Sequence, residues 1–184
     1  MGGLNAALFQ SIHGLAGQNA ILDGLGIFFA EYFPYVLTLG FLILALRESG
    51  WRRKAYVVIE GALALVLAPG FITLTVHYFY FHPRPFAFYG FMPLISESGA
   101  SFPSGHAAWF FALALVVFWT DRAWGVWYFI FAFVNGLARI YVGVHWPFDI
   151  LGGAAAGVFA ALFIRGLLTD VRKGLYGERQ AGAA

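Results

Sequence analysis

Long apolar stretches make up most of this sequence, and short polar segments separate them. Five such stretches run over residues 26–46, 55–81, 106–120, 124–138 and 146–168. A helix that crosses the hydrocarbon core of a membrane needs about 17 to 25 apolar residues, which the third and fourth stretches reach only with flanking residues. The pattern predicts an all-α protein, a polytopic membrane bundle of five transmembrane helices.

A shorter apolar segment, residues 4–15, precedes these spans. It carries Asn5, Gln10 and His13 around its circumference, and it is shorter than a membrane span. We expect a helix that lies at the membrane interface and anchors the chain, with a sixth transmembrane helix as the alternative.

Composition agrees with the pattern. Hydrophobic residues make up 61% of the 184 residues and charged residues 11%, with a mean hydropathy of +0.76. Soluble domains typically have about 25% charged residues, so a soluble protein is excluded, and the expected partner is the bilayer rather than a nucleic acid. The absence of cysteine excludes a thiolate nucleophile and a zinc–thiolate site. Protein partners cannot be predicted.

The distribution of basic residues predicts the orientation. The segment 47–54 carries four cations and one acid, and the tail carries Arg172, Lys173 and Arg179. Both belong on the cytoplasmic side of the cell (inner) membrane, because cytoplasmic loops are enriched in lysine and arginine. The polar residues of 81–103 and 139–145 then face the extracytoplasmic side. We expect residues 1–170 to form one membrane domain and residues 171–184 a disordered cytoplasmic tail.

The most informative polar residues are His145 and Asp149, at the mouth of the last apolar stretch. Ionisable groups are costly there and usually functional. Pro147 suits the first turn of a helix, so the two side chains should share one face, with the carboxylate holding one imidazole nitrogen.

Further groups suited to phosphate occur nearby in the predicted topology. Prolines on both sides stiffen the backbone at Arg84. Ser104, Gly105 and His106 begin the third span, where free N–H groups and the helix dipole favour an anion. Arg139 ends the fourth span. Two guanidiniums, a helix N-terminus, two imidazoles and a carboxylate suit phosphoryl transfer.

Taken in order, these residues resemble the type 2 phosphatidic acid phosphatase superfamily. Its signature reads Lys-x6-Arg-Pro, then Pro-Ser-Gly-His, then Ser-Arg-x5-His-x3-Asp. The corresponding residues here are Arg84-Pro85, Pro103-Ser104-Gly105-His106 and Arg139-x5-His145-x3-Asp149. Two positions depart from the signature, because His77 replaces the lysine and Ala138 replaces the serine.

The resemblance implies a mechanism and a role for each residue. His145 attacks phosphorus and forms a phosphohistidine, Asp149 orients it, and His106 serves as acid and then base. The phosphate is bound by Arg84, Ser104, the Gly105 N–H and Arg139, with His77 as a further candidate. Only one carboxylate lies within the motifs, so neither a metal nor another cofactor is expected.

Each residue also has a structural interpretation. His145 and Asp149 alone could be a helix-capping pair, and the two arginines could lie at the headgroup level. His77 and His82 are more typical of packing or interface positions. Glu97 is expected to be a solvated loop carboxylate, and the aromatic residues of 78–89 an interfacial belt.

The short length, the segment 9–15 and the run 81–86 most resemble the bacterial undecaprenyl-diphosphate phosphatases. That resemblance implies removal of the terminal phosphate of a lipid diphosphate at the outer face. Alternatives within the superfamily are phosphatases of phosphatidylglycerophosphate, phosphatidic acid or lipid A. A lipid-phosphate transporter or flippase would instead place its charges near the midplane, in repeated halves. A vanadium haloperoxidase would share the anion pocket, but the hydropathy argues against that soluble group.

Overall fold

The computed structural model describes residues 3–181, with side-chain surroundings up to residue 176. Over this range the chain consists of helices and connecting loops. The helices are α1 (Leu4–His13), α2 (Ala20–Ile27), η1 (Phe28–Tyr32), α3 (Phe33–Leu46), α4 (Trp51–Leu65), η2 (Val66–Thr73), α5 (Leu74–Phe79), α6 (Pro85–Tyr89), α7 (Gly105–Thr120), α8 (Arg122–Tyr141), α9 (Pro147–Leu167) and α10 (Thr169–Ala181).

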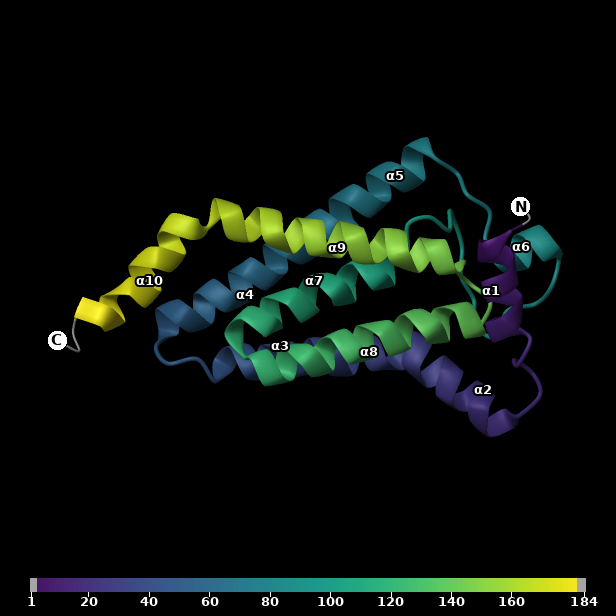
Figure 1. Cartoon of the computed structure of the whole chain (residues 1–184), viewed down its shortest axis with the longest axis horizontal. Helices are drawn as coiled ribbons and strands as arrows, with labels where there is room; N and C mark the ends of the chain where they lie inside the picture. Colours follow the sequence, from purple (N-terminus) through teal and green to yellow (C-terminus); the bar gives the residue numbers. More distant parts are fainter. Residues whose placement is uncertain (1–2, 182–184) are drawn as a thin grey trace.

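The spans form an elongated bundle along the long axis of Figure 1. Within the described part of the chain, four helical stretches are long and apolar enough to cross a membrane: Ala20–Leu46, Trp51–Phe79, Arg122–Tyr141 and Pro147–Leu167. Helix α7 is a fifth, shorter apolar helix. The predicted all-α membrane bundle with five spans is therefore confirmed.

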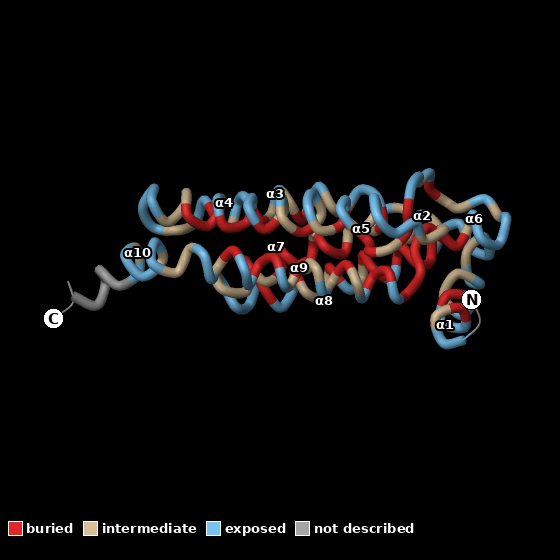
Figure 2. The backbone as a smooth tube through the Cα atoms, turned by 90° about the horizontal axis from the view of Figure 1, so that it is seen from above, coloured by how far each residue is buried: buried red, intermediate tan, exposed pale blue. Residues whose placement is uncertain are grey.

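Helix α7 is the centre of the bundle. It packs against α8, α9 and α4, and the side chains of Ala112, Leu113 and Val116 are fully buried. Buried residues follow the inner faces of the helices, and exposed residues follow the outer faces (Figure 2). The exposed residues include large apolar side chains such as Leu39 and Phe159. An apolar exterior around an apolar core is typical of a protein surrounded by lipid tails.

Glycines allow α9 to approach α7 closely. A Cβ atom at Gly157 would lie 2.3 Å from the carbonyl oxygen of Ala108, and at Gly153 equally close to that of Ser104. Small residues of α9 thus form its contact with α7, as in other closely packed membrane helices.

Two spans bend where their helices include π-helical segments. Segment η1 lies just before Pro34, and η2 contains Pro69. Proline removes a helical hydrogen bond and sterically disturbs the preceding turn. Beyond these bends α2 and α5 lean away from the bundle axis on opposite sides, so the bundle is wider at this end (Figure 1).

Helix α1 lies across the wide end of the bundle (Figure 1). Its Phe9 is buried against Trp146 with ring centroids 5.2 Å apart, and His13 Nδ1 lies 2.8 Å from the carbonyl oxygen of Tyr141. Ten residues of helix extend about 15 Å, half of the hydrocarbon core. This length suits the expected interfacial helix rather than a sixth span.

The structure differs from the sequence prediction at two places. Helix α4 begins at Trp51, so Arg52 and its basic neighbours lie in a helical turn rather than in a loop. The tail predicted to be disordered over 171–184 instead forms α10 as far as residue 181; residues 182–184 lie outside the described range. Leu175 explains the difference, because it packs against the core and its carbonyl oxygen accepts two hydrogen bonds from Arg53.

Candidate active site

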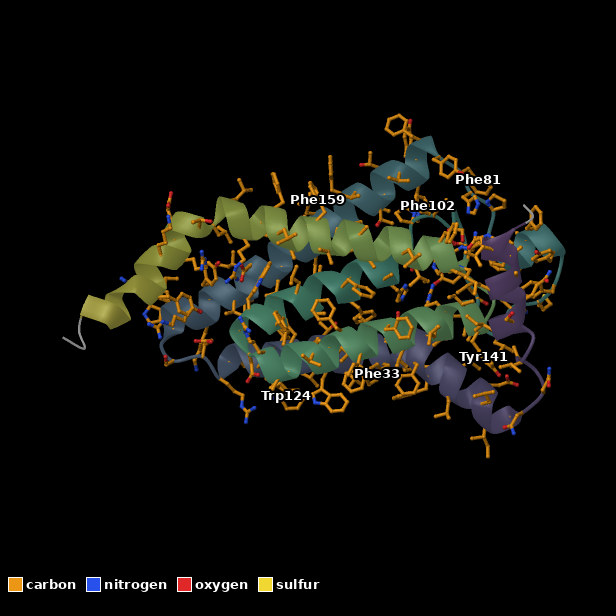
Figure 3. All side chains as sticks on the ribbon, viewed as in Figure 1. Phe33, Phe81, Phe102, Trp124, Tyr141 and Phe159 are labelled. Atoms are coloured by element: carbon orange, nitrogen blue, oxygen red, sulfur yellow. The ribbon has the colours of Figure 1, made fainter. Side chains whose placement is uncertain are left out.

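The predicted site residues converge at the wide end of the bundle. Arg84 is the N-cap of α6, Ser104 is the N-cap of α7, and Arg139 lies in the last turn of α8. His145 precedes α9, whose first turn contains Asp149. Figure 3 shows nitrogen- and oxygen-bearing side chains gathered at this end, between the labelled Phe102 and Tyr141. Residues that lie up to 65 positions apart in sequence thus share one site.

The start of α9 fixes the histidine and its carboxylate. Pro147 occupies the first turn, and Asp149 Oδ2 accepts the backbone N–H of Trp146 at 2.8 Å. This capping interaction turns the carboxylate back toward the residue that precedes the helix. His145 Nδ1 consequently lies 3.5 Å from Asp149 Oδ2.

The other imidazole nitrogen faces two guanidiniums. His145 Nε2 lies 3.3 Å from Arg84 NH1 and 3.4 Å from Arg139 NH2. With Nδ1 directed at a carboxylate and Nε2 at cationic donors, the network favours the tautomer with its proton on Nδ1. The lone pair of Nε2 then points to where the two arginines converge.

Backbone carbonyls hold Arg84 in this position. Its guanidinium donates to the carbonyl oxygens of Ser98, Gly99 and Val144 at 3.0 to 3.2 Å. Trp146 is fully buried and donates its indole N–H to the carbonyl of Pro83, one residue before the arginine. Arg84 is thus a fixed cation rather than a headgroup-level side chain.

The surroundings keep His145 neutral. Burial lowers the pKa of His145 to about 4, and the positive charges of Arg139 and Arg84 act in the same direction, while Asp149 opposes them. An imidazole with a pKa well below 7 is unprotonated at neutral pH and can act as a nucleophile.

The N-terminus of α7 completes the site. Ser104 Oγ accepts the N–H of Ala107, which caps the helix and leaves its hydroxyl proton free to donate to a ligand. The N–H groups of the first turn, including that of Gly105, have no partner within a helix. His106 in the same turn interacts electrostatically with Arg139, Glu97 and His145.

His77 is directed elsewhere. Its Nε2 lies 3.0 Å from the carbonyl oxygen of Pro103. It therefore contacts the loop that leads to Ser104, and a direct contact with phosphate stays a prediction.

The structure adds three residues to the predicted set. Ser101 Oγ donates to Asp149 Oδ2 at 2.5 Å, and His82 Nδ1 lies 3.6 Å from Asp149 Oδ1. Ser101 thus holds the carboxylate that orients the nucleophile, whereas His82 lies beside it without a hydrogen bond. Glu97 is the third, and its carboxylate forms ion pairs with both arginines of the site.

The expectation that Glu97 is a solvated loop carboxylate was therefore wrong. Burial by itself raises the pKa of Glu97, but Arg139 and Arg84 outweigh it, so the pKa lies below its ordinary value. Glu97 is ionised at neutral pH. The contact between Glu97 and the arginines could not be predicted from the sequence, because it depends on how the loop 91–104 folds over the ends of the spans.

Comparison with known proteins identifies the family of this chain. Residues 58–173 match the PAP2 superfamily. The chain is 33% identical to undecaprenyl-diphosphatase BcrC of Bacillus subtilis (strain 168), over 88% of this chain and 83% of that protein. It is 34% identical to putative undecaprenyl-diphosphatase YbjG of Escherichia coli (strain K12), over 86% of this chain and 80% of that protein. The crystal structure of Aquifex aeolicus LpxE superposes with a TM-score of 0.74 at 28% identity, covering 89% of this chain and 95% of that one.

Proposed function

Because the chain belongs to the PAP2 superfamily, we propose that this membrane phosphatase removes the terminal phosphate of a lipid diphosphate at the extracytoplasmic face of the cell membrane. The substrate we propose is undecaprenyl diphosphate, which the enzyme converts to undecaprenyl phosphate for reuse as the carrier lipid of cell-wall synthesis. Two relatives with this activity in their names, each matching more than four fifths of the chain, support the choice.

One observation carries the proposal: His145 presents Nε2 to the point where Arg84 and Arg139 converge, and its Nδ1 faces Asp149. A terminal phosphate held by the two guanidiniums would have its phosphorus next to the lone pair of Nε2. Holding both reactants in this way supplies much of the catalysis in phosphoryl transfer.

The reaction we propose has two steps. His145 Nε2 bonds to the terminal phosphorus as the bond to the bridging oxygen breaks, and His106 protonates that oxygen. In the second step His106 takes a proton from water, the water oxygen bonds to phosphorus, and the nitrogen–phosphorus bond breaks to release inorganic phosphate. Asp149 stabilises the positive charge that develops on the imidazole.

The groups around the phosphate stabilise its negative charge. Arg84 and Arg139 neutralise its oxygens, and Ser104 and the Gly105 N–H donate from the N-terminus of α7. His77 could add a donor only by exchanging its bond to Pro103. No step of this scheme uses a metal ion or a cofactor.

A groove supports access for a lipid tail from the side of the bundle. It has a volume of about 350 Å³, and Gly105 and His106 are among the residues that line it. Its walls come from both bent spans, with Pro34 on one side and Pro69 on the other, and Trp109 lines it as well. A predominantly apolar groove that ends at the catalytic groups suits a substrate with a phosphate head and an isoprenoid tail.

The test is phosphate release by the purified protein in detergent. We expect the highest kcat/KM with undecaprenyl diphosphate and lower values with undecaprenyl phosphate, phosphatidic acid, phosphatidylglycerophosphate and lipid A. Preference for one of the other lipids would reject the proposed substrate and favour the corresponding alternative. A protein that binds these lipids without releasing phosphate from any of them would instead fit a transporter or flippase.

A further inference from the structure

Glu97 pairs with both arginines of the proposed anion site. One carboxylate oxygen, Oε1, pairs with Arg139 NH2, and the other, Oε2, lies 3.4 Å from Arg84 NH2. These are the two guanidiniums that face Nε2 of His145. A carboxylate that uses both oxygens on two guanidiniums makes the contacts that two phosphate oxygens would make.

A bound phosphate and Glu97 therefore compete for the same donors. The carboxylate is tethered to the chain and is ionised, since the arginines hold the pKa of Glu97 below its ordinary value. Any ligand must displace the Glu97 carboxylate. The apparent affinity of the ligand is its intrinsic affinity multiplied by the fraction of time that the carboxylate is away from the arginines.

Displacement requires only a side-chain rotation. The backbone around Glu97 is fixed, because Arg84 bonds to the carbonyl oxygens of Ser98 and Gly99 and because Ile95 is buried. The Glu97 side chain itself is 23% exposed, so it borders the outside of the site. The carboxylate can leave while the loop and Arg84 stay in place.

The competition has a chemical consequence for an enzyme inside a bilayer. The surrounding phospholipids carry phosphodiesters, each with a charge of about −1, whereas a terminal phosphate carries about −1.5 to −2 at neutral pH. Exchanging Glu97 for a diester replaces one negative charge by another and gains little. Exchanging it for a terminal phosphate brings additional charge and a third oxygen to the arginines and the α7 N-terminus.

We propose that Glu97 is a tethered competitor that keeps the phosphodiester headgroups of the bilayer out of the active site, so that only lipids with a terminal phosphate occupy it. This inference rests on the proposed function, since it assigns a selectivity to the same site. It concerns binding rather than the chemical step.

The test compares two ligands that have the same alkyl tail. In both, a carbon–phosphorus bond, which a phosphatase cannot hydrolyse, joins the tail to the phosphorus. Decylphosphonate stands for a terminal phosphate and its monomethyl ester for a diester. Binding is measured by calorimetry with the full-length protein in detergent. Glu97→Gln should bind both ligands about 10-fold more tightly or more, because loss of a charged competitor removes a charge-assisted pair. The matched control Glu48→Gln, on the loop at the opposite end of the bundle, should bind like the wild type.

A second readout connects binding with selectivity. In mixed micelles of rising phosphatidylglycerol content, turnover of the substrate identified by the lipid panel should fall several-fold for Glu97→Gln and stay unchanged for the wild type. Glu97→Asp, whose shorter side chain cannot pair with both arginines at once, should give intermediate affinities.

The outcomes separate this inference from the proposed function. Unchanged or weaker binding of both ligands by a folded Glu97→Gln protein would overturn it, because Glu97 would then only position the arginines. Because neither ligand is turned over, the binding result holds whichever lipid the enzyme hydrolyses. Conversely, a failed lipid panel with tighter binding by Glu97→Gln would reject only the substrate.

Discussion

Ser104 donates its backbone N–H to the carbonyl oxygen of Asp149 at 2.9 Å, so the N-termini of α7 and α9 are hydrogen bonded to each other. Helix α7 begins with the expected phosphate donors, and α9 begins with Asp149, the carboxylate beside the expected nucleophile His145. This hydrogen bond fixes the distance between the two helix N-termini. The small residues of α9 permit the close approach of the helices.

Gly153 is the position where this contact can be tested. A Cβ atom there would lie 2.3 Å from the Ser104 carbonyl oxygen and 2.8 Å from Ala107 Cβ. Because backbone must shift, Gly153→Ala should reduce kcat/KM by about 10- to 100-fold, as expected when catalytic groups move by about 1 Å. Gly166→Ala, in the same helix with open space around it, should leave kcat/KM unchanged. Equal activity of the two variants would contradict the role of the contact.

The covalent step predicts a labelled enzyme. Acid-labile phosphate should appear on His145 in rapidly quenched wild-type protein, and His145→Ala should lose both the label and turnover, by several orders of magnitude. Asp149→Asn should preserve binding but lower kcat by about 10²- to 10⁴-fold, because the charge that stabilises the imidazolium is lost. Label on another residue would reject His145 as the nucleophile.

The effect of replacing His106 on turnover should depend on the leaving group of the substrate. Replacement of His106 by alanine should slow the hydrolysis of lipid monophosphates most, because the departing alkoxide needs protonation. The hydrolysis of diphosphates should slow less, because the departing lipid phosphate is a weaker base. The measurement is the ratio of kcat values of wild type and His106→Ala on undecaprenyl phosphate and undecaprenyl diphosphate. The same loss with both substrates would contradict a role on the leaving oxygen.

The lowered pKa of His145 predicts how stability depends on pH. The folded pKa of about 4 lies below the ordinary value of about 6.5, so the folded state takes up this proton less readily than the unfolded state. The free energy of unfolding should therefore fall between about pH 6.5 and pH 4, by on the order of 3 kcal/mol. Thermal unfolding in detergent at pH 7.5 and pH 5 measures this. His145→Gln should lose less stability on acidification than the wild type, and an equal loss would assign the effect to other groups.

The orientation can be tested with single cysteines, since the natural sequence contains none. A cysteine at Ser98, exposed beside the candidate site, should react with an impermeant thiol reagent added to intact cells, whereas one at Ser49, exposed at the other end, should not. The reverse labelling pattern would place the site in the cytoplasm.

Spans and motif residues could be predicted because their signals are local. Apolar runs, Pro147 in the first turn of α9 and Ser104 as the N-cap of α7 depend on a few neighbouring residues.

Contacts made by loops could not be predicted in this way. Glu97 pairs with Arg139, 42 residues away, and Ser101 reaches Asp149 only because the loop folds over the helix ends. The helical tail was missed for a similar reason, since Leu175 is held by Arg53 of a distant helix.

The order of the site residues along the chain has a consequence for biosynthesis. Arg84, Ser104 and Arg139 precede His145, and Asp149 lies at the start of the last span. Once the ribosome has completed α8, and before it reaches α9, the emerging protein has the two proposed phosphate-binding arginines but lacks the proposed nucleophile. In the proposed mechanism, hydrolysis can begin only after the start of α9 has joined the bundle, so an incompletely synthesised chain would leave the surrounding lipids intact.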